Sequence, residues 1–385
     1  MEEKKKKRKG GNGSLAFLIT VLCWVPLFID DIFPLSTLML SIGVELASVI
    51  FLFIIVVSLI VSIIIHEAGH LVFGLLSGYG FCSFRIFSLM WIKTDDGIKL
   101  KRYSVPGTAG QCLLTPPEAK DGKMPTTIYN LGGSLLGLIA TVVFAFATWL
   151  VRCTTIPCML FATLSVANLM SALTNGIPMQ TNMINNDGKN TLLLRRNPRA
   201  VESLRIQLLV NAENSKGVSL VDMPDEWFVL PPDDELTDAM VLSWAAMRFE
   251  RLCLKDEYAE ARDLALRMLS SDKLLGLHRA SITISLAFVH IMLGEYDDAR
   301  RIFKKEYYKN SALYQRSIEA ARTRYAYELL VKGSESGARR QLCIFNMLMR
   351  RLKSYPFQST LDHERELIEK INSIYEDRKS SEKMQ

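Results

Sequence analysis

The stretch IFLFIIVVSLIVSIIIHEAGH, residues 50–70, decides how this chain folds. Residues 50–65 carry no charge, and the apolar run resumes after the histidines and continues to Leu76. A helix of this length and composition can cross a hydrocarbon core of about 30 Å. The ionisable side chains of His66, Glu67 and His70 interrupt the run, and such groups are costly inside a bilayer. We therefore expect them to have a function.

The spacing of these three residues indicates a metal site. Two histidines four residues apart lie on the same face of a helix, one turn from each other. Their imidazoles can bind one Zn²⁺, and Glu67 between them can act as general base toward a water that this ion polarises. The alternative is a buried, hydrogen-bonded histidine pair at a helix end. An apolar span disfavours that alternative, because no water is there to solvate the polar groups.

The composition differs strongly between the two halves of the chain. Hydrophobic residues make up 49% of it and the net charge is +6, but the first half is apolar and the second half is charged. The positive charge is concentrated at residues 4–9 and in loops beside apolar segments, which predicts membrane topology and not nucleic-acid binding. We expect a basic tail at 1–12, a membrane domain at 13–190, a linker at 191–235, a soluble helical domain at 236–377 and a disordered tail at 378–385.

Four apolar segments are predicted to span the cell membrane, at residues 15–29, 43–76, 131–151 and 156–173. The first follows a basic run, as a signal peptide does. Asp30 and Asp31 follow it in place of a small-residue cleavage site, so we expect an uncleaved anchor. Lysine and arginine are enriched in the N-terminal tail, in the loop 78–127 and after the fourth segment. This alternation predicts a multi-pass protein with both termini in the cytoplasm and the histidines near the cytoplasmic end of their helix.

Zinc needs a third protein ligand, and Asp187 is the candidate. It lies just after the fourth segment, in the stretch that runs from Asn175-Gly176-Ile177-Pro178 to Asp187-Gly188. Pro178 is expected to end the helix at Ile177. The predicted topology then brings Asp187 to the same side of the membrane as the two histidines. The alternative is an ordinary Asp-Gly turn, and the amides of the nearby asparagines are poor zinc ligands.

Together these motifs resemble the intramembrane zinc metalloproteases of the site-2 protease type, over about residues 40 to 190. That family combines an H-E-x-x-H helix with a later Asn-x-x-Pro and Asp-Gly element. Asn130–Gly137 is similar to its glycine-rich helix start, which serves close packing, and Gly110–Pro117 resembles a branch common in Gram-positive bacteria. Pro178 and Asp187 are farther apart than is usual in the family, and Lys189 replaces its second glycine.

The resemblance implies a site and a substrate class. Zn²⁺ would be bound by His66, His70 and Asp187, with Glu67 as the base. Asn175 would hydrogen-bond the oxyanion or the substrate backbone. The substrate would be a membrane-embedded protein or peptide, such as a single-span protein, a signal-peptide remnant or a pheromone precursor.

Two shorter patterns leave alternatives open. Residues 98–101 alternate in polarity after the turn Thr94-Asp95-Asp96-Gly97, which predicts a β hairpin. Its exposed edge could hold an unwound substrate by strand addition, or the hairpin could have no substrate role. Cys153 and Cys158 lie in the predicted outer turn and could form a disulfide, although two free thiols are favoured.

The soluble half contains an internal repeat. Asp256–Arg262 recurs as Gly294–Arg300, 38 residues later, in a pattern that resembles the tetratricopeptide repeat. The predicted function is a groove for a cytoplasmic protein or peptide partner, and the alternative is a helical cap that binds nothing.

The sequence therefore predicts an α-helical integral membrane domain of about four transmembrane helices with a small β-hairpin insert, followed by an α-helical repeat domain. The predicted activity is intramembrane zinc-dependent proteolysis. The competing prediction is a catalytically inactive membrane receptor or scaffold that recruits partners through its repeats. An intact Glu67 argues against it, because a scaffold needs no base between two metal ligands. A metal transporter would need more intramembrane acids than this chain has.

Overall fold

The computed structural model describes residues 13–29, 32–104, 108–118, 124–180, 185–236, 238–304, 317–352 and 358–383. The predicted basic tail at 1–12 lies outside this part. The chain divides into two compact units, and each is described by itself below. The first comprises Met1–Phe87 and Gly107–Val201, and the second comprises Ser88–Pro106 and Glu202–Gln385.

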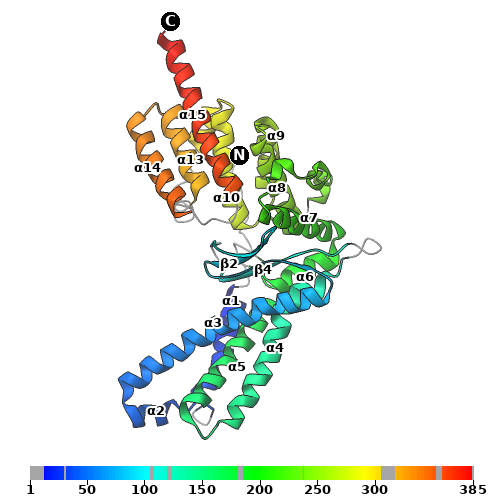
Figure 1. The fold of residues 1–385 in the computed structure, drawn as a ribbon, viewed down its shortest axis with the longest axis vertical. Coiled ribbons are helices and arrows are strands. Elements are labelled where there is room, and N and C mark those ends of the chain that lie inside the picture. Colours follow the sequence, from blue (N-terminus) through cyan, green and yellow to red (C-terminus); the bar gives the residue numbers. More distant parts are fainter. Residues whose placement is uncertain are drawn as a thin grey trace, which may run out of the picture. The chain divides into compact units, whose positions relative to one another are not determined.

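The first unit is mainly helical (Figure 1). Its elements in chain order are α1 (Gly13–Trp24), the 3-10 turn η1 (Val25–Phe28), α2 (Leu35–Ile42), α3 (Val44–Leu76), α4 (Thr126–Leu150), α5 (Thr155–Gly176) and α6 (Asp187–Arg196). Helix α5 ends one residue before Ile177, because Pro178 cannot continue the helical hydrogen bonding. The predicted helix end is thus confirmed.

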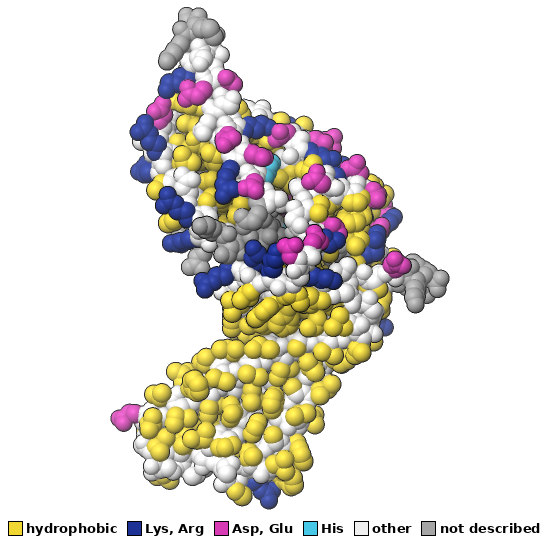
Figure 2. Space-filling view, in the orientation of Figure 1, with side chains coloured by type: hydrophobic (Ala, Val, Ile, Leu, Met, Phe, Trp, Pro, Cys, Tyr) yellow, Lys and Arg dark blue, Asp and Glu magenta, His cyan; other side chains and the backbone are white. Residues whose placement is uncertain are grey.

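Three helices, α3, α4 and α5, are long and apolar enough to cross a membrane. The first apolar segment, predicted to be a fourth span, forms the 12-residue α1 followed by η1, which is shorter than these three. Large hydrophobic side chains are exposed along α3 and α4. On the face drawn in Figure 2, such side chains cover most of the first unit, whereas charged side chains are spread over the second. The apolar surface suits lipid and would be costly in water.

A pair of antiparallel strands completes the first unit. Strand β1 (Gly80–Ile86) pairs with β4 (Gly110–Thr115), and β4 is the last strand of its sheet. In the second unit, β2 (Leu89–Thr94) and β3 (Gly97–Arg102) form a hairpin whose closing pair is Thr94 and Gly97. The predicted hairpin turn is therefore confirmed, with Gly97 at φ 110°, a conformation that favours glycine.

Besides this hairpin, the second unit contains most of α7 (Pro198–Ser215) and the helices and helical turns that follow it. They are the 3-10 turns η2 (Leu220–Asp222), η3 (Asp225–Phe228) and η4 (Asp233–Glu235), and then α8 (Ala239–Leu254), α9 (Tyr258–Ser270), α10 (Gly276–Met292), α11 (Tyr296–Ile302), α13 (Ile318–Ala326), the π-helical turn η7 (Tyr327–Val331), α14 (Glu335–Arg351) and α15 (Gln358–Lys383). The stretch 191–235, predicted as a linker, contains most of α6 and all of α7. Likewise α15 continues to Lys383, where a disordered tail was predicted from 378 onward.

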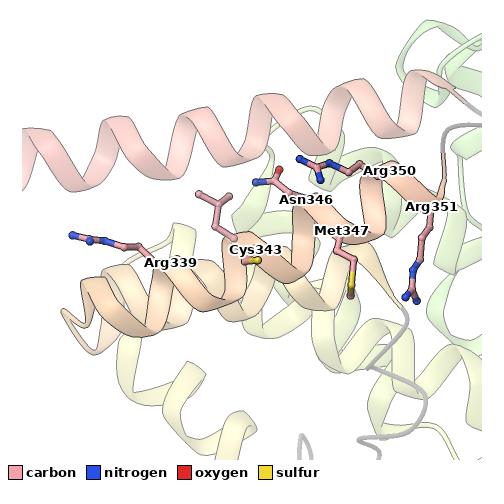
Figure 3. A pocket seen from close by; sticks show the side chains of 7 residues that line it. Arg339, Cys343, Asn346, Met347, Arg350 and Arg351 are labelled. Carbon is pink, nitrogen blue, oxygen red and sulfur yellow. The ribbon is translucent and has the colours of Figure 1, made fainter.

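The internal sequence repeat coincides with a left-handed turn that recurs before three helices in the described part of the second unit. Left-handed residues precede α9, α11 and α14 at Asp256 (φ 60°), Gly294 (φ 76°) and Gly333 (φ 65°). In each case the fourth residue of the following helix is a buried alanine: Ala261, Ala299 and Ala338. A small residue there lets α9 approach α8, α11 approach α10 and α14 approach α13. The exposed face of α14 carries Arg339, Arg350 and Arg351 along a shallow hollow (Figure 3).

Candidate metal centre

Three side chains predicted as zinc ligands converge at one point of the first unit. The Nε2 atoms of His66 and His70 are 3.2 Å apart. Oδ2 of Asp187 lies 3.1 Å from the first and 3.3 Å from the second. Three N/O ligands in a tetrahedral zinc site with bonds of about 2.0–2.1 Å are about 3.3 Å from one another. The triangle therefore has the dimensions that a zinc ion requires.

The hydrogen bonding of His70 shows why this triangle suits a cation. Its Nδ1 lies 2.9 Å from the backbone carbonyl oxygen of Tyr129, which can only accept a hydrogen bond. In the neutral ring the proton is therefore on Nδ1, and the Nε2 lone pair faces Asp187. A lone pair facing a carboxylate is repulsive unless a metal ion, or a proton on Nε2, lies between them. Oδ2 of Asp187 is buried and has no hydrogen-bond partner in the described part of the chain, which fits the same conclusion.

Close packing of α3 against α4 fixes the two histidines. A Cβ atom on Gly132 would lie 2.6 Å from the carbonyl oxygen of Gly69, and one on Gly133 would lie 2.5 Å from the ring of His66. Only glycine leaves room for this approach of the two backbones. The glycine-rich stretch of α4, predicted to serve close packing, thus packs directly against α3, the helix that carries the motif.

Asp187 is positioned by Asn186, a residue that sequence reasoning considered only as a poor ligand. Oδ1 of Asn186 accepts hydrogen bonds of 2.9 Å from the backbone N–H groups of Met179 and Lys189. Its amide nitrogen donates to the carbonyl oxygens of Thr174, at 2.7 Å, and Ile177, at 2.6 Å. Asn186 is thus the N-cap of α6 and also holds the start of α6 against the end of α5. This double attachment puts Asp187 at the first position of α6.

Gly188 explains why Asp-Gly stands at this point. A Cβ atom there would collide with the backbone carbonyl of Gly176 at the end of α5. The two helix ends can approach each other this closely because Gly188 has no side chain. The spacing between Pro178 and Asp187, longer than is usual in the family, therefore does not prevent Asp187 from reaching the histidines.

Glu67 is buried on the same helix turn, at 8% exposed. Its carboxyl group contacts the backbone of Gly110, the first residue of β4, so closely that a Cβ on Gly110 would collide with it. Arg85, a fully buried residue of β1, donates a 3.0 Å hydrogen bond to the Gly110 carbonyl and a 2.6 Å bond to Oγ1 of Thr108. Arg85 thus fixes the start of β4 beside Glu67, a role the sequence did not suggest.

The remaining predicted residues are placed as follows. The Asn175 side-chain amide donates a 3.0 Å hydrogen bond to the carbonyl of Ser171, one turn back in α5. Its predicted contact with an oxyanion or substrate backbone stays a prediction. Cys153 and Cys158 are both free thiols, the first exposed and the second buried. The favoured prediction for this pair, two free thiols, agrees with the structure.

A second group of possible ligands lies in the other unit and is accounted for by ion pairs. His290, Glu295 and Asp298 are close enough to hold an ion. However, Glu295 pairs with Arg262 as well as with His290, and Asp298 pairs with Arg301. The arginines already supply the positive charge that a metal would bring.

Comparisons with protein-family models, with curated proteins and with solved structures found no match for this chain. The functional argument therefore rests on the geometry of the site itself. Two imidazoles and one carboxylate, with a buried glutamate beside them, are the side-chain types found in hydrolytic zinc sites.

Proposed function

We propose that this protein is an intramembrane zinc metalloprotease that hydrolyses peptide bonds of a membrane-embedded protein or peptide. One observation carries the proposal. Three ligand atoms with the separations of a tetrahedral zinc site converge within the apolar unit, and Glu67 lies on the same helix turn. Ionisable groups are retained in such surroundings when they are needed for function.

Each residue of the site would have one role in peptide hydrolysis. His66, His70 and Asp187 would hold Zn²⁺, which when bound supplies a Lewis acid that polarises the scissile carbonyl group and the attacking water. Glu67 accepts a proton from that water and delivers it to the leaving amine. The Tyr129 carbonyl keeps His70 in the tautomer that leaves Nε2 free.

Strand β4 is the part of the first unit best placed to hold an extended substrate. It begins at Gly110, beside Glu67, and it is the last strand of its sheet. A helical substrate hides its carbonyl groups in helical hydrogen bonds, so a peptide bond must be unwound before it can be cut. Addition of the unwound segment to β4 would present its backbone next to Glu67. The proposed substrate edge is therefore β4, whereas the sequence suggested the edge of the hairpin at residues 94–101.

The proposal includes a location and a partner. The chain would be a multi-pass protein of the cell membrane with both termini in the cytoplasm, and α1 with η1 would supply a fourth crossing beside α3, α4 and α5. The helical pairs of the second unit would form a tetratricopeptide-like array that binds a cytoplasmic protein or peptide. The turns at Asp256, Gly294 and Gly333 support a repeated unit.

Metal content and cleavage, measured on matched variants, test the proposal. The purified full-length protein should contain one zinc per chain by elemental analysis, and His66→Ala should contain none. Glu67→Gln keeps the shape of the side chain but removes the base. It should keep zinc and lose proteolysis by about 10²–10⁴-fold. Glu45→Gln, an exposed acid at the start of the same helix, is the control and should behave like wild type.

Cleavage can be followed without a known substrate, as new N-termini within apolar segments of proteins in membranes that contain each variant. Unchanged cleavage by Glu67→Gln would refute the mechanism. Stoichiometric zinc with no cleavage dependent on Glu67 would favour the receptor or scaffold alternative.

A further inference from the structure

The second unit encloses a cavity of about 400 Å³ that the metal centre does not use. Its walls come from α7, α8, α10, α13 and α15, so it extends across successive layers of the helical array. Small ligands and peptide side chains bind in cavities of this size when a few charged groups converge in them.

The charged groups on its wall are unequally balanced. Glu250 of α8, Glu319 and Arg322 of α13, and Glu364 of α15 all line the cavity. With all four ionised, three negative charges face one positive charge. The single arginine is already engaged, since its Nε lies 2.8 Å from Oε2 of Glu364 and its guanidinium stacks 4.0 Å from the ring of Phe288.

Even this buried pair is incompletely satisfied. Glu364 is 4% exposed and Arg322 5% exposed. Oε2 of Glu364 and Nε of Arg322 are not aligned for a hydrogen bond despite their short separation, and both atoms are otherwise unpartnered in the described part of the chain. A buried carboxylate on the cavity wall thus lacks a full set of donors, which is costly unless a ligand supplies one.

Glu250 lacks compensation altogether. Its side chain is exposed on the wall of the cavity. The protein around it, and after that the charge of Glu319, raises the pKa of its carboxyl group to about 7. Among the described residues, no cation opposes this shift. The carboxyl group of Glu250 therefore lacks both a positively charged neighbour and an N–H donor among the described residues.

We infer that this cavity is a binding site for a basic side chain, arginine or lysine, of a partner peptide, with Glu250 and Glu319 as its principal acceptors. The inference deepens the partner binding proposed above and does not involve the metal. A guanidinium or ammonium group would bring both the missing charge and several donors. The apolar part of the wall suits the alkyl part of such a side chain.

A peptide fits the surroundings better than an isolated metal ion would. Among the described residues, no three possible ligand atoms of this wall lie close enough together to hold one metal ion. In addition, α8 contacts α10, α10 contacts α13, and α13 contacts α15, so the cavity runs along a row of packed helices. An extended peptide could lie along them while one basic side chain enters the cavity.

Binding can be measured on the full-length protein in detergent, in the Glu67→Gln background so that no peptide is cut. The probes are four pools of fluorescent nonapeptides whose central residue is arginine, lysine, glutamine or glutamate, with uncharged residues elsewhere. We expect the arginine and lysine pools to bind at least about tenfold more tightly than the glutamine pool, and the glutamate pool most weakly. Glu250→Gln with Glu319→Gln should abolish this order.

Two further variants keep the test decisive. Glu226→Gln with Glu257→Gln removes two exposed acids of the same unit that do not line the cavity, and it should leave the order of the pools unchanged. Ser281→Arg places a guanidinium at an exposed position of the cavity wall and should weaken binding of the arginine and lysine pools without disturbing the core.

Equal binding of all four pools, or an order that survives the loss of Glu250 and Glu319, would overturn the inference. So would binding of spermidine with no binding of any peptide pool, which would indicate a small amine as the ligand. Because neither readout involves hydrolysis, a negative result here leaves the protease proposal standing, and loss of the protease proposal leaves this test valid.

Discussion

Gly133 lies directly against the imidazole of His66, with room for a hydrogen atom but not for a methyl group. A Cβ atom built on Gly133 would stand 2.5 Å from Cε1 of the ring, well inside contact distance. The position of a proposed metal ligand on α3 is thus set by the absence of a side chain on α4.

This relationship predicts that Gly133→Ala loses the metal. The added methyl group must push the His66 ring or separate the helices, and overpacking of this kind costs about 1–3 kcal/mol. Zinc content should fall well below one per chain while the protein still inserts into membranes. Gly137→Ala is the control, because its new methyl group would meet Ala172 at 3.2 Å and lies away from the histidines. Full zinc occupancy in Gly133→Ala would show that the packing does not position the ligand.

Asp187 is predicted to behave as a metal ligand when it is removed. Asp187→Ala takes away one of the three proposed protein ligands, so its zinc content and activity should fall as they do in His70→Ala. Asp222→Ala removes an exposed acid elsewhere and should change stability by no more than about 0.5 kcal/mol, with zinc retained. Elemental analysis of the three purified variants decides the matter. If Asp187→Ala keeps stoichiometric zinc and full activity, the third ligand is another residue.

The proposed topology can be tested with thiols that the chain already has. Cys153 and Cys343 are both exposed, and the topology places the first outside the cell and the second in the cytoplasm. A membrane-impermeant maleimide added to intact cells should label Cys153 and spare Cys343, and lysis should make both reactive. Cys153→Ser and Cys343→Ser identify the labelled site. Labelling of Cys343 in intact cells would mean that the orientation is inverted.

The parts of the site that sequence could predict are those fixed by local geometry. The spacing of His66 and His70 follows from one helical turn, and Pro178 ends α5 because it lacks an N–H group. The glycines of α4 were expected to pack closely, but their partners, Gly69 and His66, became visible only in three dimensions.

Residues that act through their backbone or as caps escaped sequence reasoning. The Tyr129 carbonyl that orients His70 leaves no trace in residue type. Asn186 is a poor zinc ligand, and its role as a cap was not predicted, although an asparagine just before Asp-Gly at a helix start is a recognisable N-cap signal. Arg85 supports Gly110 across two strands, a contact that depends on their pairing.

The repeat was also underestimated. Ala338-Arg339 follows Ala299-Arg300 by 39 residues, nearly the interval that separates Ala299-Arg300 from Ala261-Arg262. The third copy has Glu335 where the others have tyrosine, so a search for tyrosine missed it. The left-handed turn at Gly333 reveals the common geometry.

The pH dependence of the second unit provides the last prediction. Enclosure by protein, followed by repulsion from Glu319, raises the pKa of Glu250 from 4.5 to about 7 in the folded chain. Between these values the folded state holds a proton that the unfolded chain has released, so this group's contribution to stability falls as the pH rises from about 4.5 to 7. Charged and titratable groups of three helices face the same cavity: His278, Glu319, Arg322, His363 and Glu364. These groups are the same in wild type and in Glu250→Gln, so a comparison of the two proteins at equal pH reports the effect of Glu250.

Glu250→Gln should therefore match wild type at pH 5 and exceed it at pH 8. Hydrogen exchange of α8 in the full-length protein, compared at equal pH, reports the local stability. Protection should rise by roughly tenfold or more at pH 8, since each unit of pKa shift corresponds to a factor of ten in the equilibrium. Glu226→Gln, which alters an exposed acid, should show no such pH-dependent gain. Equal protection of Glu250→Gln and wild type at pH 8 would mean that the Glu250 charge is already compensated, which would also remove the electrostatic basis for a cationic ligand.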